Sequence, residues 1–316
     1  MSTYDYEYTE FLTFPNIRLF VIDLVNSHVH MHKELELCYI LSGEAEVLTG
    51  RQEKYHCVNG DMILLNSRQV HEIYAVNCKC VKILTLQISP AFCLHFFPEI
   101  DNVSFDNAIV NKCLSRDQME QLQALLYKLA QHYFKMGQYS PFYCESSACL
   151  ILSLLLENIP WHHISEMEKI NLNITGYRID RIVNYIEKNY TEKILLKDIA
   201  DQEKLSLDYL SHFFRKHLHL SFQEYVSKLR FEKARLLLLK TDMSLTSICI
   251  SSGFTDCRQM RKVFKSLANC EPEDYRKGFP AESGMYNTRP LNSIETELEE
   301  TEALITLREH FEGNGH

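Results

Sequence analysis

One sequence pattern occurs twice in the last third of the chain, about 50 residues apart. In each copy, apolar residues recur at helical spacing on both sides of a short break, which predicts two short helices joined by a tight turn. When the copies are aligned, Leu210 corresponds to Met260 and Phe214 to Phe264. Two such helices form a helix-turn-helix, whose second helix enters the major groove of duplex DNA. The duplication therefore predicts an all-α region that holds two reading helices.

The charge of this region fits contact with a polyanion. Residues 173–280 contain 19 Lys and Arg residues against 14 Asp and Glu residues, a net charge of +5 in a chain whose net charge is −9. A localised basic segment in an acidic protein is the electrostatic footprint expected of a DNA-binding region. Solvated helix faces without a partner are the alternative interpretation of the same charges.

The region resembles the DNA-binding domain of the AraC/XylS family of bacterial transcription regulators, over roughly residues 175–277. The resemblance rests on ordered matches at Tyr209-Leu210-Ser211, Phe214-Arg215-Lys216, Ser221-Phe222-Gln223-Glu224-Tyr225, Leu229-Arg230, Ala234-Arg235, Gly253-Phe254-Thr255-Asp256, Phe264-Lys265, Pro272 and Tyr275-Arg276. Leu195 and Lys204 depart from the family's pattern, which has a capping Ser or Thr and a turn Gly at these points.

The outward positions of each second helix are the candidate DNA contacts. We expect these helices to begin after Ser206 and Asp256, since short polar side chains favour the N-cap position. Among the outward residues, Arg258 suits guanine and Gln259 suits adenine, whereas later cations suit phosphates. Because the first copy is only weakly basic, most of the affinity is expected from the second. The candidate DNA-binding residues are Asp208, Ser211, His212 and Arg215 in the first copy, and Arg258, Gln259, Arg261, Lys262 and Lys265 in the second.

The N-terminal half has the pattern of a small β-barrel or sandwich. Between about residues 14 and 87, short apolar or alternating runs are separated by turn-forming pairs such as Ser42-Gly43 and Asn59-Gly60, which predicts many short strands. The region resembles a cupin barrel. The matching residues are His30, His32, Glu36 and Gly43 for the first cupin motif, and Gly60, Asp61 and His71 for parts of the second.

His30, His32, Glu36 and His71 are the candidate effector-binding residues. Three imidazoles and a carboxylate would suit iron, manganese, nickel or zinc. The AraC/XylS resemblance implies instead an organic ligand bound without metal, so we expect no metal ion and no cofactor. A third interpretation, in which these side chains satisfy one another at the barrel mouth, stays open.

Two helices are expected after the barrel, at residues 117–135 and 142–157, because each range has an apolar face. They either only cover the barrel or, as the family resemblance implies, also form an antiparallel dimer interface. We expect residues 159–174 to be a linker, since they contain Pro160 and many polar residues. The acidic tail, residues 281–316, is expected to be mobile, with a docking helix as the alternative.

The cysteines and the N-terminus bear on the cell compartment. The eleven cysteines include no Cys-x-x-Cys pair, so we expect buried free thiols, including the close pair Cys78 and Cys80, rather than a metal site. The N-terminus lacks a basic region followed by an apolar stretch, and no apolar run reaches the ~18 residues of a membrane-spanning helix. We therefore expect a cytoplasmic protein with reduced thiols and no membrane contact.

These patterns predict an α+β multidomain chain. Residues 1–158 are expected to form a cupin-like β-barrel with two covering or dimerisation helices, and residues 175–280 an all-α tandem helix-turn-helix domain. We expect a transcription regulator, and not an enzyme, that binds double-stranded DNA under the control of a small-molecule effector. The resemblance implies a homodimer, sugars as one effector class, and RNA polymerase as a further candidate partner. Two alternatives compete: a cupin metalloenzyme with an attached DNA-binding module, and an architectural DNA-binding protein whose barrel is filled by its own side chains.

Overall fold

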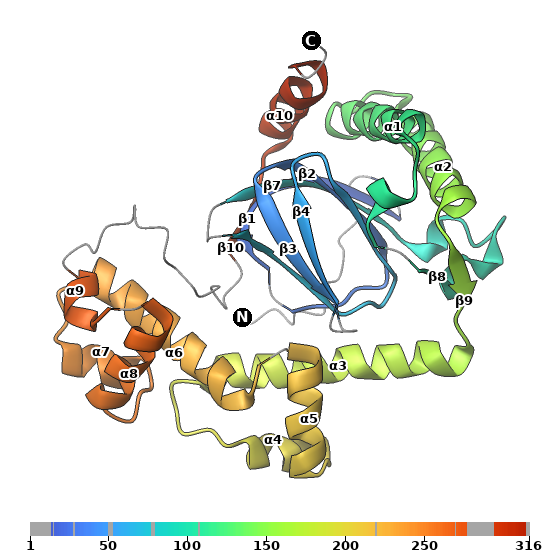
Figure 1. The fold of residues 1–316 in the computed structure, drawn as a ribbon. Coiled ribbons are helices and arrows are strands. Elements are labelled where there is room, and N and C mark those ends of the chain that lie inside the picture. The colour runs from blue at the N-terminus through green and yellow to red at the C-terminus, as the bar shows by residue number, and fades with distance from the viewer. Residues whose placement is uncertain are drawn as a thin grey trace.

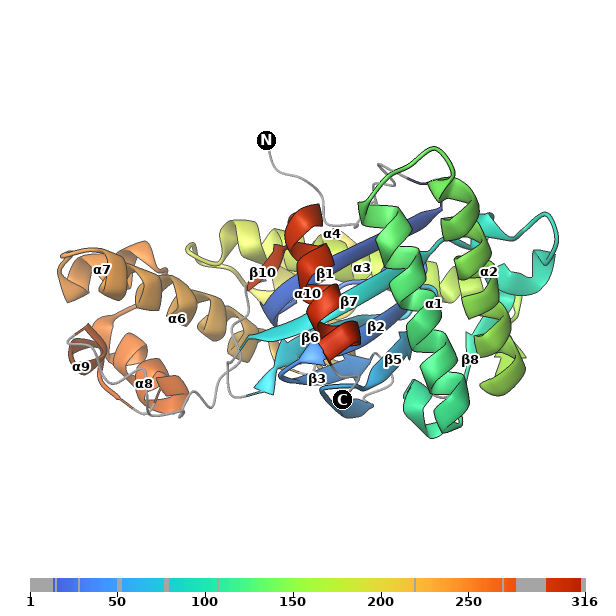
Figure 2. The same cartoon turned by 90° about the horizontal axis from the view of Figure 1, so that it is seen from above.

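The computed structural model describes residues 14, 16–27, 29–49, 53–76, 80–106, 108–218, 220–268, 270–276 and 294–313. A β-rich N-terminal half with helices on one side is followed by an all-helical region (Figure 1). Seen from above, helices α6 to α9 extend away from the β-rich half (Figure 2). The predicted fold class is therefore confirmed.

An antiparallel sheet forms the N-terminal half. It curves into a barrel-like form, in the strand order β4-β3-β6-β1-β7-β2-β5 (Figure 1). Gly43 and Gly60 make two of its turns with φ angles of 87° and 91°, which residues with a side chain rarely adopt. The strands are β1 (Ile17–Asn26), β2 (Leu35–Ser42), β3 (Glu44–Thr49), β4 (Lys54–Val58), β5 (Met62–Leu65), β6 (His71–Ala75) and β7 (Val81–Ile88).

The two faces of the sheet bury two different apolar clusters. In β2, Cys38 and Ile40 belong to a cluster within the curve of the sheet, whereas Leu37 and Tyr39 belong to a cluster shared with the covering helices. This alternation follows from the two-residue period of a strand. Because both faces are buried, β2 is almost continuously apolar. The interior of the barrel is thus occupied largely by the protein's own side chains.

Two helices cover the outer face of the sheet, close to the predicted ranges. α1 (Arg116–Phe134) begins with a capping box formed by Ser115 and Gln118, and α2 (Ser140–Asn158) runs beside it. Their buried faces share the outer cluster of the sheet, so the covering role is observed. Phe142 and Leu150 on the other side of α2 stay exposed, and dimerisation through that side stays a prediction.

The segment predicted as a linker has regular structure. β8 (Val103–Phe105) pairs with β9 (Trp161–His163), and α3 (Glu166–Asn189) begins directly afterwards with Ser165 as its N-cap. The predicted linker, residues 159–174, therefore holds a strand and the first turns of a long helix. Their polar composition reflects exposed positions of that helix such as Glu166.

The C-terminal region contains two helix pairs joined by a long helix. α4 and α5 form the first helix-turn-helix, α7 and α8 form the second, and α6 lies between them (Figure 1). The short α9 packs against α6 and α8. The helices are α4 (Leu196–Glu203), α5 (Leu207–Leu218), α6 (Phe222–Lys240), α7 (Leu245–Ser251), α8 (Cys257–Ala268) and α9 (Pro272–Arg276).

The tail returns to the barrel, so the prediction of a mobile tail does not hold for residues 294–313. β10 (Ile294–Glu297) pairs with β1, and α10 (Glu300–Gly313) packs against α1. Leu298, Ala303 and Leu307 are buried in the outer cluster of the barrel. Their burial explains why an acidic segment is ordered, because its apolar stripe supplies the packing that the tail's overall composition conceals. Residues 281–293 and 314–316 lie outside the described residues.

Two further expectations concern the thiols and the membrane. All ten described cysteines are free, and six of them are buried; Cys78 lies outside the described residues. Within the described ranges, no helix combines the length and the apolar character needed to cross a bilayer.

Candidate DNA-reading helices and effector cavity

The two predicted reading helices begin where the sequence places them. The Ser206 hydroxyl accepts a hydrogen bond from the Tyr209 backbone N–H at 3.2 Å, before α5. The Asp256 carboxylate accepts one from the Gln259 backbone N–H at 2.8 Å, before α8. Each cap satisfies one of the donors that a helix leaves open at its first turn.

The same two positions anchor each reading helix in its core. Leu210 and Phe214 in α5, and Met260 and Phe264 in α8, have no exposed surface. The Phe214 ring packs edge-on against Phe222 and Tyr225 of α6, and the Phe264 ring packs against Phe231 of α6 and Tyr275 of α9. The apolar faces of both helices are thus fixed, and their opposite faces are left to solvent.

The turns of the two units are made differently. Gly253 has a φ angle of 81°, and a Cβ atom there would lie 2.5 Å from the Cα of Thr191. Lys204 adopts the same left-handed region, with a φ angle of 55°, and its N–H bonds back to the carbonyls of Ala200 and Asp201. Lys204 therefore replaces the family's glycine but keeps the same turn, at some conformational cost.

The side chains predicted to contact DNA differ in their exposure and in whether they have partners inside the chain. In α5, Asp208, His212 and Arg215 are exposed and Ser211 is half-buried. In α8, Arg258, Lys262 and Lys265 are exposed, and no hydrogen bond or ion pair engages them within the described residues.

Gln259 and Arg261 have partners inside the chain. The Gln259 side-chain oxygen accepts a hydrogen bond from the Thr255 backbone N–H at 3.0 Å. The Arg261 guanidinium forms ion pairs with Glu271 and Glu273, whose carboxylates raise its pKa. Both side chains are therefore less free than those of Arg258, Lys262 and Lys265.

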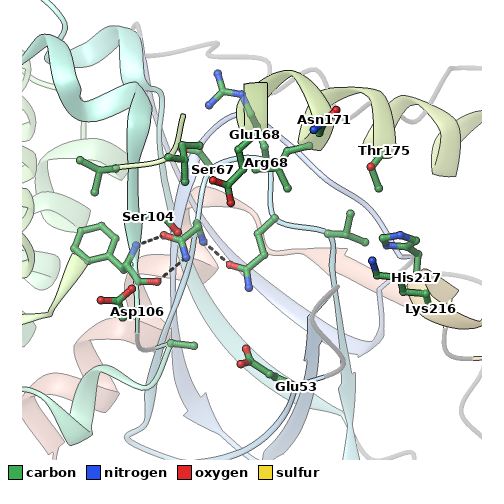
Figure 3. A pocket seen from close by; sticks show the side chains of 18 of the residues that line it. Glu53, Ser67, Arg68, Ser104, Asp106, Glu168, Asn171, Thr175, Lys216 and His217 are labelled. Carbon is green, nitrogen blue, oxygen red and sulfur yellow. Dashed lines mark hydrogen bonds between the residues drawn. The ribbon is translucent and has the colours of Figure 1, made fainter. Parts of the chain in front are cut away.

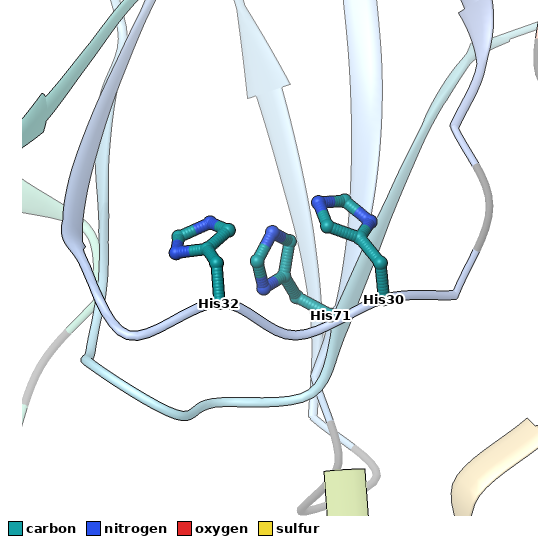
Figure 4. Close-up of side chains that lie close together, drawn as sticks. All are labelled: His30, His32 and His71. Carbon is teal, nitrogen blue, oxygen red and sulfur yellow. The ribbon is translucent and has the colours of Figure 1, made fainter. Parts of the chain in front are cut away.

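The four predicted effector-binding residues come together at one end of the barrel interior. His30, His32 and His71 lie side by side (Figure 4), with ring centroids 4.2 Å apart for His30 and His71 and 5.0 Å apart for His32 and His71. Reciprocal backbone hydrogen bonds of 3.0 Å join His30 to His71. The Glu36 carboxylate lies 2.9 Å from Nε2 of His32.

His32, Glu36 and His71 are buried, His30 is half-buried, and the four side chains lie against one another. Burial opposes ionisation of Glu36, but the hydrogen bond and charge of His32 outweigh it and lower the pKa of Glu36 well below its usual value. Glu36 also accepts hydrogen bonds from Gln87 at 2.8 Å and from the Cys38 thiol at 3.0 Å. Burial, reinforced by His30, lowers the pKa of His71 to about 3. The cluster therefore combines an ionised carboxylate with a neutral His71 imidazole.

A metal ion fits this cluster poorly, although nitrogens of the three histidines lie within 4.8 Å of one another. Nδ1 of His32 lies 3.2 Å from the Glu34 carbonyl, and Nε2 lies 2.9 Å from Glu36. Both neighbours are acceptors, so each ring nitrogen of His32 already faces a partner inside the protein. Coordination by His32 would break its bond to a buried, ionised carboxylate. Mutual satisfaction is the interpretation that this geometry favours.

A cavity of about 430 Å³ lies outside the barrel, where its loop at residues 66–70 meets α3 and α5 (Figure 3). Its volume is within the roughly 300–1,000 Å³ range of small-molecule sites. None of the four predicted effector-binding residues lines it. The sequence could not indicate this position, because the cavity is shared between segments that are far apart in the chain. Its polar lining residues include Asn66, Ser67, Gln69, Ser104, Asn171, Thr175 and Lys216.

The cluster, the cavity and the first helix-turn-helix are structurally connected. Met31, between His30 and His32 in the chain, is buried in the same apolar cluster as Leu210 and Phe213 of α5. Val70, which precedes His71, belongs to that cluster and also lines the cavity. Met31 lies so close to α3 that a Cβ atom on Gly176 would be 1.9 Å from its Cε. Both histidine segments are therefore in direct packing contact with the helices of the DNA-reading half.

Comparison with known proteins identifies both halves. A model of the AraC-like ligand binding domain matches residues 24–130, and a model of a helix-turn-helix domain matches residues 199–278.

An uncharacterized HTH-type transcriptional regulator of Staphylococcus aureus strain MSSA476 is 22% identical over 290 residues, which cover 89% of this chain and 36% of that protein. The Msm operon regulatory protein of Streptococcus mutans serotype c is 31% identical over 127 residues, covering 40% of this chain and 44% of that protein. The chain thus spans little more than a third of the length of the first relative. Both relatives are described as regulators and not as enzymes, which agrees with the sequence prediction.

Solved structures with related sequences cover about a third or most of the chain. The C-terminal domain of the response regulator YesN from Fusobacterium nucleatum is 36% identical, covers 31% of this chain and 95% of its own, and superimposes with a TM-score of 0.30. ToxT from Vibrio cholerae O395 is 14% identical, covers 84% of this chain and 99% of its own, and superimposes with a TM-score of 0.34. Scores this low say nothing about how the two halves of this chain are arranged.

Proposed function

Because the chain belongs to the AraC family of helix-turn-helix transcriptional regulators, we propose that it binds duplex DNA through α5 and α8 and that a small molecule held beside α5 controls this binding. The observation that carries the proposal is the matched construction of the two helices. Both have a polar N-cap, a fully buried pair of anchors and an outward face with cationic residues. Helices held in this way can enter successive major grooves on one side of a duplex.

The proposed contacts divide into base readers and phosphate contacts. Arg258 is the principal reader, since a guanidinium can contact guanine through two hydrogen bonds. Gln259 reads adenine once its side chain releases the Thr255 backbone N–H. Asp208, Ser211 and His212 of α5 read further bases. The remaining candidates contact phosphates, which fix register without reading sequence. These are Arg215, Arg261, Lys262 and Lys265.

Binding is tested with the full chain on DNA selected from a random pool. We expect a recovered motif with two half-elements about one helical turn apart, and an affinity that falls steeply with salt as phosphate contacts release counterions. The matched control is the same protein with Arg258→Ala, which should keep salt dependence but lose part of the motif. A folded protein without salt-dependent DNA binding would overturn the proposal.

We place the effector in the cavity beside α5, because the barrel interior is filled by an apolar cluster and by the bonded histidines. His30, His32, Glu36 and His71 then support the loop at residues 66–70 that forms one wall. An occupant would touch this loop and α5 at once, so it would favour one arrangement of the two halves. A variant such as His71→Ala should therefore weaken the effector response while DNA binding is retained.

Our proposal for the assembly rests on the same family membership. We propose a homodimer, with the exposed side chains of α2 as part of its interface, so that two chains place four reading helices on one operator. RNA polymerase is the partner through which such a regulator would act on transcription. A regulator of chromosomal genes would work in the cytoplasm. Sedimentation of the full chain with and without Phe142→Glu tests the dimer.

A further inference from the structure

The cavity beside α5 has two walls of opposite charge. Lys216 and His217 lie together on one side, and Asp106 lies on the opposite side (Figure 3). The wall formed by the barrel and α3 carries the carboxylates of Glu53, Asp106 and Glu168. The wall formed by α5 carries His212, Lys216 and His217.

One charge on each wall has no partner inside the chain, whereas Asp106 pairs with His162 at 2.6 Å and Glu53 accepts a hydrogen bond from Tyr55 at 2.7 Å. Lys216 and the Glu168 carboxylate have no ion-pair or hydrogen-bond partner among the described residues. Arg68 also lines the cavity, but its guanidinium is buried and bonded to Asp101 at 2.7 Å. It therefore does not neutralise the acidic wall.

On the basis of the proposed regulatory function, we propose that the cavity binds a zwitterionic ligand of the class of short peptides with free ends. Its ammonium group would face Glu168, and its carboxylate would face Lys216. Between the walls, the side chains of Gln69, Asn171 and Thr175 can donate to and accept from peptide groups.

Ligands of other charge match this cavity less well. An anion would leave the Glu168 carboxylate without a partner, and a cation would leave Lys216 without one. A neutral polyol would satisfy the amides and hydroxyls but would displace water from both charged walls without compensation. A zwitterion pairs both walls, and Coulomb attraction is stronger in a partly enclosed cavity than in water.

The ligand would also connect the sensor half to a reading helix. Lys216 lies one residue beyond Arg215, a proposed phosphate contact on the same helix. A carboxylate bound at Lys216 would hold α5 against the barrel. We therefore expect the ligand to change the first unit's contribution to DNA binding and leave the second unit's contribution intact.

The experiment measures the melting temperature of the full chain with trialanine as the probe. The matched controls are N-acetyl-trialanine, trialanine amide and maltose, which lack the ammonium group, the carboxylate and both charges respectively. Because a ligand that binds only the folded state raises its stability, we expect the largest rise with trialanine. Each blocked peptide should give a smaller rise, and maltose the smallest.

Two variants test which wall binds the ammonium group of the peptide and which wall binds its carboxylate. Lys216→Met should remove the advantage of trialanine over its amide, and Glu168→Gln should remove its advantage over the N-acetyl form. Glu145→Gln, on the exposed surface of α2 and away from the cavity, should change neither. Circular dichroism before each titration verifies that the variants are folded.

Three results would overturn the inference: no rise with trialanine, equal rises for free and blocked peptides, or a larger rise with maltose. Salt-dependent DNA binding is measured on the same preparations. If wild-type protein binds DNA but trialanine fails, only the ligand class is wrong. If DNA binding itself is absent, the proposed regulatory function fails independently.

Discussion

The two helix-turn-helix units have the same internal packing but different surroundings. Met31 and Val70 of the barrel are part of the first unit's core, together with Leu210 and Phe214. Among the described residues, the second unit's core, built around Met260 and Phe264, is made of residues 231–275. The first unit is therefore packed onto the sensor half, and the described core of the second unit includes no residue of the sensor half.

The outward faces of the two reading helices, α5 and α8, also differ. In α8, Arg258, Lys262 and Lys265 face solvent, whereas α5 combines Arg215 with the acidic Asp208. DNA affinity depends mainly on cations that meet phosphates. We infer that the second unit anchors the protein on DNA and that the first unit carries the response to the sensor half.

The largest expected effect tests whether the two cores are equivalent. Phe214→Ala and Phe264→Ala each remove a fully buried ring and should lower the free energy of unfolding by about 3–5 kcal/mol. Hydrogen exchange on the full chain should show Phe264→Ala loosening the second unit alone. Phe214→Ala should also loosen the barrel segments around Met31 and Val70.

Exposed apolar residues provide the controls for this pair. Ile250 is 70% exposed and Leu207 is 49% exposed, so their replacement by Ala should cost little. Loss of protection in the barrel with Phe264→Ala, or none there with Phe214→Ala, would contradict the proposed difference in coupling.

The sequence predicted the units well because their signals are local. The caps at Ser206 and Asp256 and the anchors at Leu210 and Phe264 are separated by a few residues, and helical period alone aligns them. The histidine cluster was also found from spacing, since His30, His32 and Glu36 share one segment. What spacing could not reveal is that His32 is committed to Glu34 and Glu36.

The cavity and the tail were missed because they depend on contacts between distant segments. Lys216 and Glu168 lie 48 positions apart, and nothing in either local sequence indicates a shared wall. Likewise, the tail's acidic composition predicted mobility, whereas Leu298 and Leu307 pack against the barrel. Composition averages over a segment, but docking depends on one face of it.

The second prediction compares the readers of the two units. Arg258→Ala should weaken binding to the selected site by about 1–3 kcal/mol and relax base preference at one position. Asp208→Ala should cost less affinity, because it removes a like charge from the phosphates as well as a base contact. Selection from random DNA with each variant measures both effects. An unchanged motif for Arg258→Ala would place the reading face elsewhere on α8.

The third prediction compares the acid stability of the two halves. Burial lowers the pKa of His71 to about 3, so below pH ~6.5 the unfolded chain binds a proton that the folded barrel excludes. Stability of the barrel should therefore fall as the pH decreases, by at most ~1.4 kcal/mol per pH unit. Glu36 acts in the same direction at lower pH, because its lowered pKa gives stability that is lost as the carboxylate becomes protonated.

Hydrogen exchange at pH 7 and pH 5.5 separates the halves in this test. Protection should decrease in β2 and β6, next to the cluster, and stay nearly constant in α8. His71→Gln should remove the pH dependence in this range. An equal loss of protection in both halves would show that the cluster is not the acid-sensitive element.

The smallest expected effect distinguishes the anchor from the responsive unit. Lys265→Ala should weaken binding to all sequences nearly alike, and it should reduce the slope of log affinity against log salt by about 0.9 if Lys265 meets one phosphate. Arg215→Ala should give a comparable reduction only when α5 is free to reach the duplex, because α5 also packs on the barrel.

Fluorescence anisotropy over a range of salt concentrations measures both slopes, with and without trialanine as the probe for the cavity. If the slope change for Lys265→Ala is independent of trialanine and that for Arg215→Ala is not, the second unit anchors and the first responds. If trialanine changes the slope effect of both variants alike, the two units respond as one body. The packing of Met31 and Val70 against the first unit would then not make its DNA contacts differ from those of the second.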